Sequence, residues 1–478
     1  PDIFFQSHAA YERYLYKNAT TMSTWDPIME LNHDMADACI ACIRNRHSIL
    51  PVQFSSHFEY AHAVEKAPTH LLRCSRFLEV ADLLAKESFV RRKLRTIGFL
   101  VGTRAHIADI EAMNKIISDR GIQNIDMDSV FISSFKVIYD VLITFDQSNF
   151  EKDGFRGADD KSLARTVEIA EALHCMGQSM LAHGFEDDAV EAYSHSLKKF
   201  EKVHSVIQSG ATENASIDGM PSLDHIQFTM AETLVGMATV NDCHGDVDNA
   251  TINYERALSF YSKDRSLRHR NGVAETLMTM GIIYFRRKHW DIAAANFEEA
   301  MEILESLDVD GSKAEDIGDI FQWLGNIRRN EGESESALAF FTEALYVITL
   351  KFGKCHSRVG RVHQNIAIIY DDLRDFNASL SHYKEALKVR IRAAALAAKS
   401  TDLRHFEVAT LEELAVAETL QCMGNVYRVT QDYERAYGCY SESAFIARLD
   451  VCALLRSNVL AVDRVMDLSR GDEADEGT

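Results

Sequence analysis

A chain of 478 residues with only 5 prolines and long segments of helical periodicity should be almost wholly helical, and it is long for one compact core. Its formal net charge of −21 at pH 7 disfavours general binding to nucleic acid or to an anionic membrane surface. No run of about 18 apolar residues occurs, so no membrane-spanning helix is expected. The nine cysteines, scattered over predicted helices, are typical of reduced thiols in a cytoplasmic protein.

Residues 1–56 are predicted to be a helical segment, with apolar stripes in FFQSHAAYERYLY and LNHDMADACIACI. Cys39 and Cys42 form a CxxC there, but no second pair stands at a zinc spacing, so we expect buried thiols and no metal site. Residues 57–160 are predicted to form a helical arm and junction. Within this arm Pro68 should open the helix that carries His70, because proline is favoured at the first helical position.

The N-terminal third also carries short motifs of a known class. P-x-H-L-L at Pro68–Leu72 is followed by an aromatic-led helix ending in L-L and by F-x-x-x-x-L-x-x-x-G at Phe89–Gly98. This order resembles the helical arm of STAND-type signalling ATPases, and FFQSH with LNHDMADACI is similar to the end of their winged helix, so residues 1–56 are interpreted as its remnant. Ala9 stands where that class has an aspartate. The resemblance implies a nucleotide-binding module upstream of Pro1.

From residue 161 to residue 445 the sequence repeats six times. Ala274–Leu304 shows the pattern: two amphipathic helices joined by a polar turn at Arg287–Asp291. With Ala274 as position 1, position 8 is small in every repeat: Gly177, Ala238, Gly281, Gly325, Ala367 and Gly424. Position 20 is also small: Ala189, Ala250, Ala293, Ala337, Ser379 and Ala436. Position 24 is aromatic: Tyr193, Tyr254, Phe297, Phe341, Tyr383 and Tyr440.

The spacing of these repeats is irregular. Successive position 8 residues stand 61, 43, 44, 42 and 57 residues apart, which predicts insertions near 209–223 and 391–412. HQNIAIIYDDLRDFNASLSHYKEALKVR, with Asn365 at position 6, resembles a tetratricopeptide repeat of the kinesin light chain type. The resemblance implies an all-α fold: an α-solenoid (TPR superhelix) preceded by an irregular helical N-terminal region. Residues 446–468 should form a capping helix, and 469–478 a disordered acidic tail.

The first helices of such a superhelix line its concave wall, where positions 2, 5, 9, 12 and 13 would face a ligand. Guanidinium groups flanked by amides suit an extended peptide that carries carboxylates. The alternative is that these side chains are merely solvated. The predicted partner-binding groove contains Arg286, Gln322, Asn326, Arg329, Arg361, Gln364, Gln421, Asn425 and Arg428.

The sequence contains no phosphate-binding G-x-x-x-x-G-K-[ST], no G-x-S-x-G and no H-E-x-x-H, so we expect neither enzymatic activity nor a cofactor. The predicted function is that of a non-enzymatic scaffold that binds a partner protein or peptide, with nucleic acid and membrane excluded as partners. Two alternatives stay open. The chain could be the sensor arm of a STAND-like ATPase, or a cargo adaptor like kinesin light chain.

Overall fold

The computed structural model describes residues 36–37, 39–40, 57–120, 122, 125–150, 160–208, 221–264, 266–308, 311–397 and 403–448. All 17 elements bounded in these ranges are α-helices, which confirms the all-α prediction. The chain forms two compact units, Pro1–Lys263 and Asp264–Thr478. Most of segment 1–56 with Cys42, most of the insertion near 209–223, and the cap and tail beyond residue 448 lie outside the described residues.

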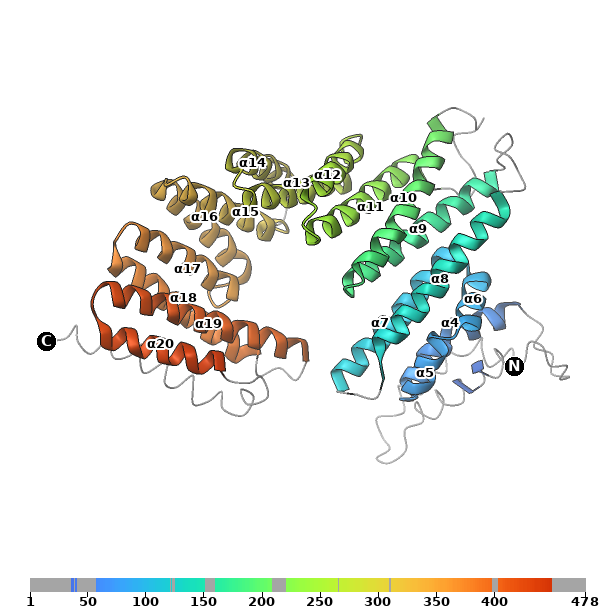
Figure 1. Cartoon of the computed structure of the whole chain (residues 1–478), viewed down its shortest axis with the longest axis horizontal. Helices are drawn as coiled ribbons and strands as arrows, with labels where there is room; N and C mark the ends of the chain where they lie inside the picture. The colour runs from blue at the N-terminus through green and yellow to red at the C-terminus, as the bar shows by residue number, and fades with distance from the viewer. Residues whose placement is uncertain are drawn as a thin grey trace. The chain divides into compact units, whose positions relative to one another are not determined.

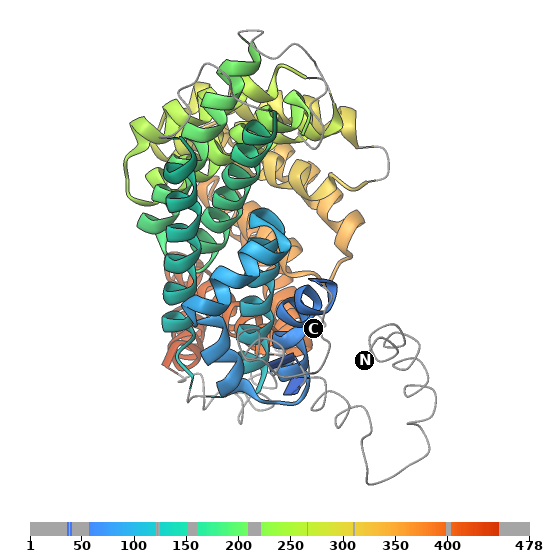
Figure 2. The same ribbon diagram turned by 90° about the vertical axis from the view of Figure 1, so that its right-hand side faces the viewer.

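The first unit contains the arm and the first two repeats. The arm helices are α4 (His57–Arg73), α5 (Phe77–Leu84), α6 (Glu87–Ile97), α7 (Phe99–Arg120) and α8 (Met127–Phe150). Repeat 1 is α9 (Asp160–Ala182) with α10 (Glu186–Gln208), and repeat 2 is α11 (Leu223–Cys243) with α12 (Val247–Tyr261). The long helices α7 and α8 lie along α9 (Figures 1 and 2), so the arm leads directly into the repeats.

Pro68 does not open a helix, and that prediction is wrong. It lies inside α4, eleven residues after the helix begins at His57. Val64, Ala67 and Leu71 are fully buried on either side of it, so the apolar stripe of the helix continues through the proline. Packing of this stripe outweighs the local cost of a proline in a helix, which removes one backbone hydrogen bond.

The arm and repeat 1 share one hydrophobic core. Side chains of the arm such as Phe89 and Phe135 belong to the same buried cluster as Leu173 and Tyr193 of repeat 1. Glu168 of α9 adds a polar link, because its Oε1 accepts hydrogen bonds from the backbone N–H groups at the start of α7: 2.7 Å from residue 99 and 3.3 Å from residue 100. The arm therefore takes the place of a preceding repeat against α9.

The second unit contains repeats 3 to 6. They are α13 (Leu267–Arg286) with α14 (Trp290–Leu307), α15 (Ala314–Asn330) with α16 (Ser334–Phe352), α17 (Ser357–Asp372) with α18 (Phe376–Ala397), and α19 (Leu403–Val429) with α20 (Tyr433–Arg448). The two helices of each repeat pack against each other, and α14, α16 and α18 also pack against the first helix of the next repeat (Figure 1). Helix α18 extends to Ala397, so the predicted insertion near 391–412 begins as a continuation of this helix.

The helices of a pair approach most closely at position 8, as predicted. A Cβ atom added to Gly281 would lie 2.8 Å from Cζ of Phe297, at position 24 of the same repeat. The corresponding distances are 2.7, 2.9 and 2.8 Å for the pairs Gly177–Tyr193, Gly325–Phe341 and Gly424–Tyr440. In four repeats the glycine at position 8 therefore packs directly against the aromatic ring at position 24. This contact confirms the predicted numbering of positions in those repeats.

The turn inside each pair is the same in all six repeats. Position 15 has a positive φ throughout: Gly184, Gly245, Lys288, Gly332, Arg374 and Gln431. The next residue donates its backbone N–H to the carbonyl at position 11, for example His289 to Tyr284 at 3.0 Å and Asp432 to Tyr427 at 2.9 Å. This six-to-one bond with a left-handed residue is a Schellman motif, which satisfies carbonyls at the end of the first helix.

Candidate functional site

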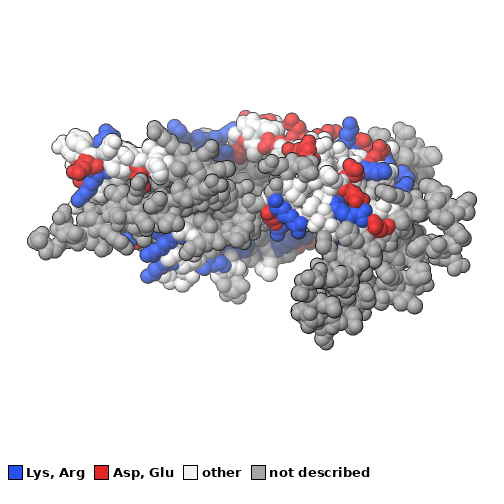
Figure 3. Space-filling view, turned by 90° about the horizontal axis from the view of Figure 1, so that it is seen from below, with Lys and Arg blue, Asp and Glu red and all other residues white. Residues whose placement is uncertain are grey.

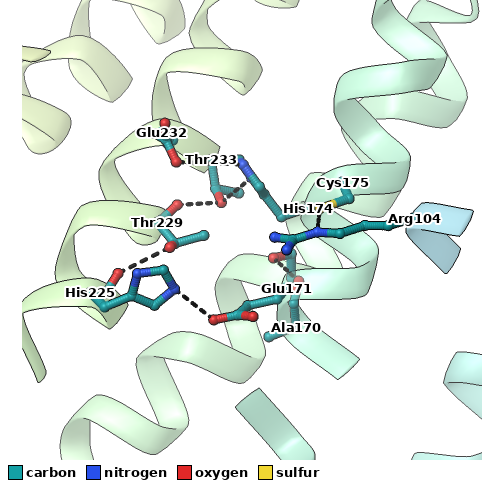
Figure 4. Close-up of polar contacts among 10 residues, drawn as sticks. Arg104, Ala170, Glu171, His174, Cys175, His225, Thr229, Glu232 and Thr233 are labelled. Atoms are coloured by element: carbon teal, nitrogen blue, oxygen red, sulfur yellow. Dashed lines mark hydrogen bonds and ion pairs between the residues drawn. The ribbon is translucent and has the colours of Figure 1, made fainter. Parts of the chain in front are cut away.

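The wall of first helices in the first unit carries a polar cluster where repeats 1 and 2 meet (Figure 4). Position 2 of repeat 1 is Glu171, only 6 % exposed, and its Oε1 accepts a 2.8 Å hydrogen bond from Nε2 of His225 on α11. Position 5 is His174, 4 % exposed, whose Nδ1 lies 2.9 Å from Oγ1 of Thr233 on the same helix. Both side chains therefore bind the next repeat.

The protonation of His174 follows from its partners. The Thr233 hydroxyl donates to the carbonyl of Thr229 at 2.7 Å, so its oxygen accepts from His174, and Nδ1 carries the proton. Burial lowers the pKa of His174 to about 4, with a further contribution from the positive charge of Arg104. This imidazole is neutral at pH 7, and the fully buried Thr233 beside it is inaccessible as a nucleophile.

Arg104 reaches the same cluster from α7. Its Nε donates to Sγ of Cys175 at 3.3 Å, and this hydrogen bond raises the pKa of the guanidinium (Figure 4). A second carboxylate, Glu232 of α11, has its Oε2 atom 3.8 Å from Nε2 of His174. The cluster thus combines one permanent cation, two carboxylates and two imidazoles from three helices. It joins the arm to both repeats, and its groups are used mainly in holding the helices together.

Position 2 also contacts the next repeat where repeats 4 and 5 meet, and position 5 supports that contact. Asp319 at position 2 accepts a 2.9 Å hydrogen bond from Nη1 of Arg358 on the next first helix, α17. Gln322 at position 5 is 7 % exposed and donates to Asp319 at 3.0 Å. Arg358 also pairs with Glu315, so one guanidinium bridges two carboxylates of the preceding repeat.

Between repeats 5 and 6 the contact uses amides and a buried cation. Gln364 at position 5 is 7 % exposed, and its Nε2 donates to Oε1 of Glu418 at 3.3 Å. Arg390 of α18 donates from Nη1 to Oγ1 of Thr419 and to the carbonyl of residue 415, both at 2.6 Å. Burial lowers the pKa of the Arg390 guanidinium. Gln322 and Gln364, expected in a ligand groove, therefore lie mostly below the surface and are engaged with neighbouring side chains.

The other predicted groove residues lie at or near the surface. Arg329 is exposed but pairs with Asp372 of the next first helix, Nε to Oδ2 at 2.8 Å. Asn425 is exposed and accepts from the Tyr440 hydroxyl at 2.7 Å. Asn326 is half-buried, whereas the exposed members are Arg286, Arg361, Gln421 and Arg428.

Sequence reasoning missed three residues that matter most between repeats: Arg104, Arg358 and Arg390. Arg104 lies in the arm, and the other two stand outside the positions that define the repeat. The sequence offers no signal for Arg390, because Lys388 and Arg392 stand on either side of it. Contact with a following repeat cannot be seen from one repeat's periodicity.

The surface charge is mixed. On the face drawn in Figure 3, groups of Lys and Arg lie beside groups of Asp and Glu. None of the helices in the described ranges combines the length and the apolar character needed to cross a bilayer.

These observations define a helical-repeat protein built from antiparallel helix pairs. Residues 316–392, in the second unit, match the family described as tetratricopeptide repeat, which confirms the predicted repeat type in that range. No curated protein matches the chain.

Solved structures that are similar to this chain match it at low identity. BtubC (BKLC) from P. vanneervenii is 18 % identical over 54 % of this chain and 89 % of its own, with a TM-score of 0.42. A kinesin light chain from Podosopora anserina with nearly identical TPR-like repeats is 12 % identical over 48 % and 95 %, with a TM-score of 0.35. Aspartyl phosphate phosphatase F from Bacillus subtilis is 9 % identical over 90 % and 97 %, with a TM-score of 0.41.

Proposed function

We propose that this chain is a non-enzymatic scaffold in the cytoplasm that binds an extended, carboxylate-bearing segment of a partner protein. The proposed contact surface is formed by Arg361 of α17 and by Gln421, Asn425 and Arg428 of α19. We call these four residues the α17/α19 surface. All four are exposed, and both helices belong to the second unit.

The exposed stripe of α19 carries this proposal. Gln421, Asn425 and Arg428 follow one another at intervals of four and three residues, which places them on one face of the helix. Asn425 uses its oxygen to accept from Tyr440, so its amide N–H groups remain to donate to a peptide carbonyl. Such regularly spaced amides suit main-chain recognition of an extended segment.

The cations of this surface favour a partner with carboxylates. Arg361 and Arg428 form no ion pair with any residue in the described ranges, so their guanidinium groups can each take a carboxylate in a forked contact. Arg329 differs, because an acidic ligand would have to replace Asp372 as its partner. We therefore assign Arg329 and Gln364 to contacts between repeats, leave out Gln322 because it is buried against Asp319 of its own helix, and place recognition on the α17/α19 surface.

The test compares peptide binding by three forms of the whole chain. Arg361→Glu with Arg428→Glu reverses both cations of the surface, and Lys354→Glu with Arg392→Glu makes the same charge change at exposed positions outside it. Each is screened against an array of extended peptides of graded acidity. We expect the first variant to lose binding to acidic peptides and the second to retain it. Equal loss in both variants, or none in either, would remove this surface from recognition.

The two alternatives remain proposals. The shared core of the arm and repeat 1 supports a sensor arm, because movement of the repeats would then displace the arm helices. A nucleotide-binding P-loop in the gene upstream of Pro1 would favour the sensor of a STAND-like signalling ATPase. Preferential binding of motor-cargo peptides would favour an adaptor like kinesin light chain.

A further inference from the structure

Two histidines face each other inside repeat 5. His363 of α17 and His382 of α18 place their Nδ1 atoms 3.1 Å apart, with ring centroids 5.4 Å apart. The rings are half-buried, and Tyr370 stacks on His382 at a centroid distance of 5.5 Å and an angle of 19°. One Nδ1 must carry a proton and the other must accept it, so the pair holds only one proton between these atoms.

The repeat register shows that this pair is unusual within the chain. His363 stands at position 4, where the other five repeats have Leu173, Leu234, Leu277, Phe321 and Leu420. His382 stands at position 23, which is Phe340 in repeat 4, and the Phe321–Phe340 contact there has a centroid distance of 6.3 Å. The packing at this point accepts two apolar rings, so core packing alone does not require imidazoles.

We propose that His363 and His382 bind a divalent transition-metal ion of the zinc type through their Nδ1 atoms. Ligand atoms of a tetrahedral zinc site, with zinc–nitrogen bonds of about 2.0–2.1 Å, lie roughly 3.3 Å apart. The observed 3.1 Å needs only a small opening of the pair, with the two lone pairs turned toward the ion.

The charges around the pair suit a cation. A metal ion binds imidazole in its neutral form, and the half-buried surroundings of both rings favour that form. Glu385 follows His382 by three residues on α18, which places the two side chains on one face of the helix. Glu385 pairs with Lys388 at 3.0 Å, so to act as a third ligand it would have to leave this ion pair and change its rotamer. Water fills the remaining positions.

The probe is Zn²⁺, titrated into the whole chain by calorimetry and followed by the melting temperature. His363→Phe with His382→Phe copies the Phe321–Phe340 contact of repeat 4, so this variant keeps an aromatic pair and should fold. His289→Gln removes an exposed histidine elsewhere and serves as the matched control. We expect the control to bind as the unsubstituted chain does and the double variant to bind at least tenfold more weakly.

Zn²⁺ should also raise the melting temperature of the unsubstituted chain and leave that of the double variant unchanged. The single variant His382→Gln can still hydrogen-bond His363 but loses one ligand, so it should bind at least tenfold more weakly with little change in metal-free stability. Equal binding by the unsubstituted chain and the double variant would overturn the proposal, as would failure of the folded chain to bind Zn²⁺.

Discussion

Replacing Gly281 tests how closely the helices of a pair must approach. In Gly281→Ala the new Cβ would lie 2.8, 2.9 and 3.0 Å from three ring carbons of Phe297, well inside van der Waals contact. The ring cannot easily move away, because it is fully buried and stacks on Trp323 at a centroid distance of 6.0 Å and an angle of 5°. The helices must therefore separate or the ring must leave its preferred rotamer.

The expected change in the free energy of unfolding is the difference between two opposing effects. Overpacking in a well-packed core typically costs about 1–3 kcal/mol, whereas glycine to alanine in a helix gains up to about 1 kcal/mol. We expect Gly281→Ala to destabilise the second unit by about 1 kcal/mol, and Gly281→Leu to destabilise it more. The matched control is Gly438→Ala in α20, where an added Cβ meets no atom within 4 Å. That variant should be more stable by up to about 1 kcal/mol.

The assay is urea unfolding of the whole chain followed by circular dichroism, with the melting temperature as a second measure. For a domain of 150–250 residues, 1 kcal/mol corresponds to roughly 2–4 °C, so opposite shifts of the two alanine variants are resolvable. If Gly281→Ala and Gly438→Ala both stabilise by the same amount, close packing at position 8 does not limit the approach of the helices. The Gly–aromatic register would then lose its energetic basis.

Three further predictions follow from the turns, the buried imidazole and the exposed ion pair. Gln431→Gly should stabilise by roughly 0.5–1 kcal/mol, measured by urea unfolding, because Gln431 has a φ of 66° in the turn; destabilisation would contradict this. Since the folded chain holds the pKa of His174 at about 4, its contribution to stability is present above about pH 6.5 and is lost as the pH falls towards 4. The loss of stability between pH 7 and pH 5 should therefore be about 2 kcal/mol smaller in His174→Gln, and an unchanged pH profile would refute the assignment. Arg329→Ala should reduce the free energy of unfolding by less than about 1 kcal/mol, because its pair with Asp372 is exposed; a loss of several kcal/mol would show that the pair is shielded from solvent.

The repeat register is predictable from the sequence because its determinants are local. Gly281 and Phe297 are sixteen residues apart, and a small residue opposite a large one has a direct steric meaning within one helix pair. The same holds for the left-handed turn, which the glycines at 184, 245 and 332 signal at position 15. Pro68 fails as a helix start because burial of its neighbours decides the outcome, and burial depends on the rest of the arm.

The site is less predictable because it depends on contacts between repeats. Gln364 looks like a groove residue from its position, yet its partner Glu418 stands 54 residues later, on the far side of a predicted insertion. Arg358 and Arg390, which bind the neighbouring repeats, stand outside the repeat pattern. His363 departs from the apolar residues that the other repeats have at position 4, but only the structure shows that it contacts His382.

The invariant turn at position 15 has a consequence for how this chain can change in length. Every connection inside a helix pair has one geometry, while the irregular spacing between repeats is confined to the links that follow second helices. Extra residues are therefore tolerated in the links between repeats but not in the turns inside helix pairs, since a longer turn would lose the six-to-one bond. A reporter domain or an epitope tag should therefore be inserted in a link between two repeats.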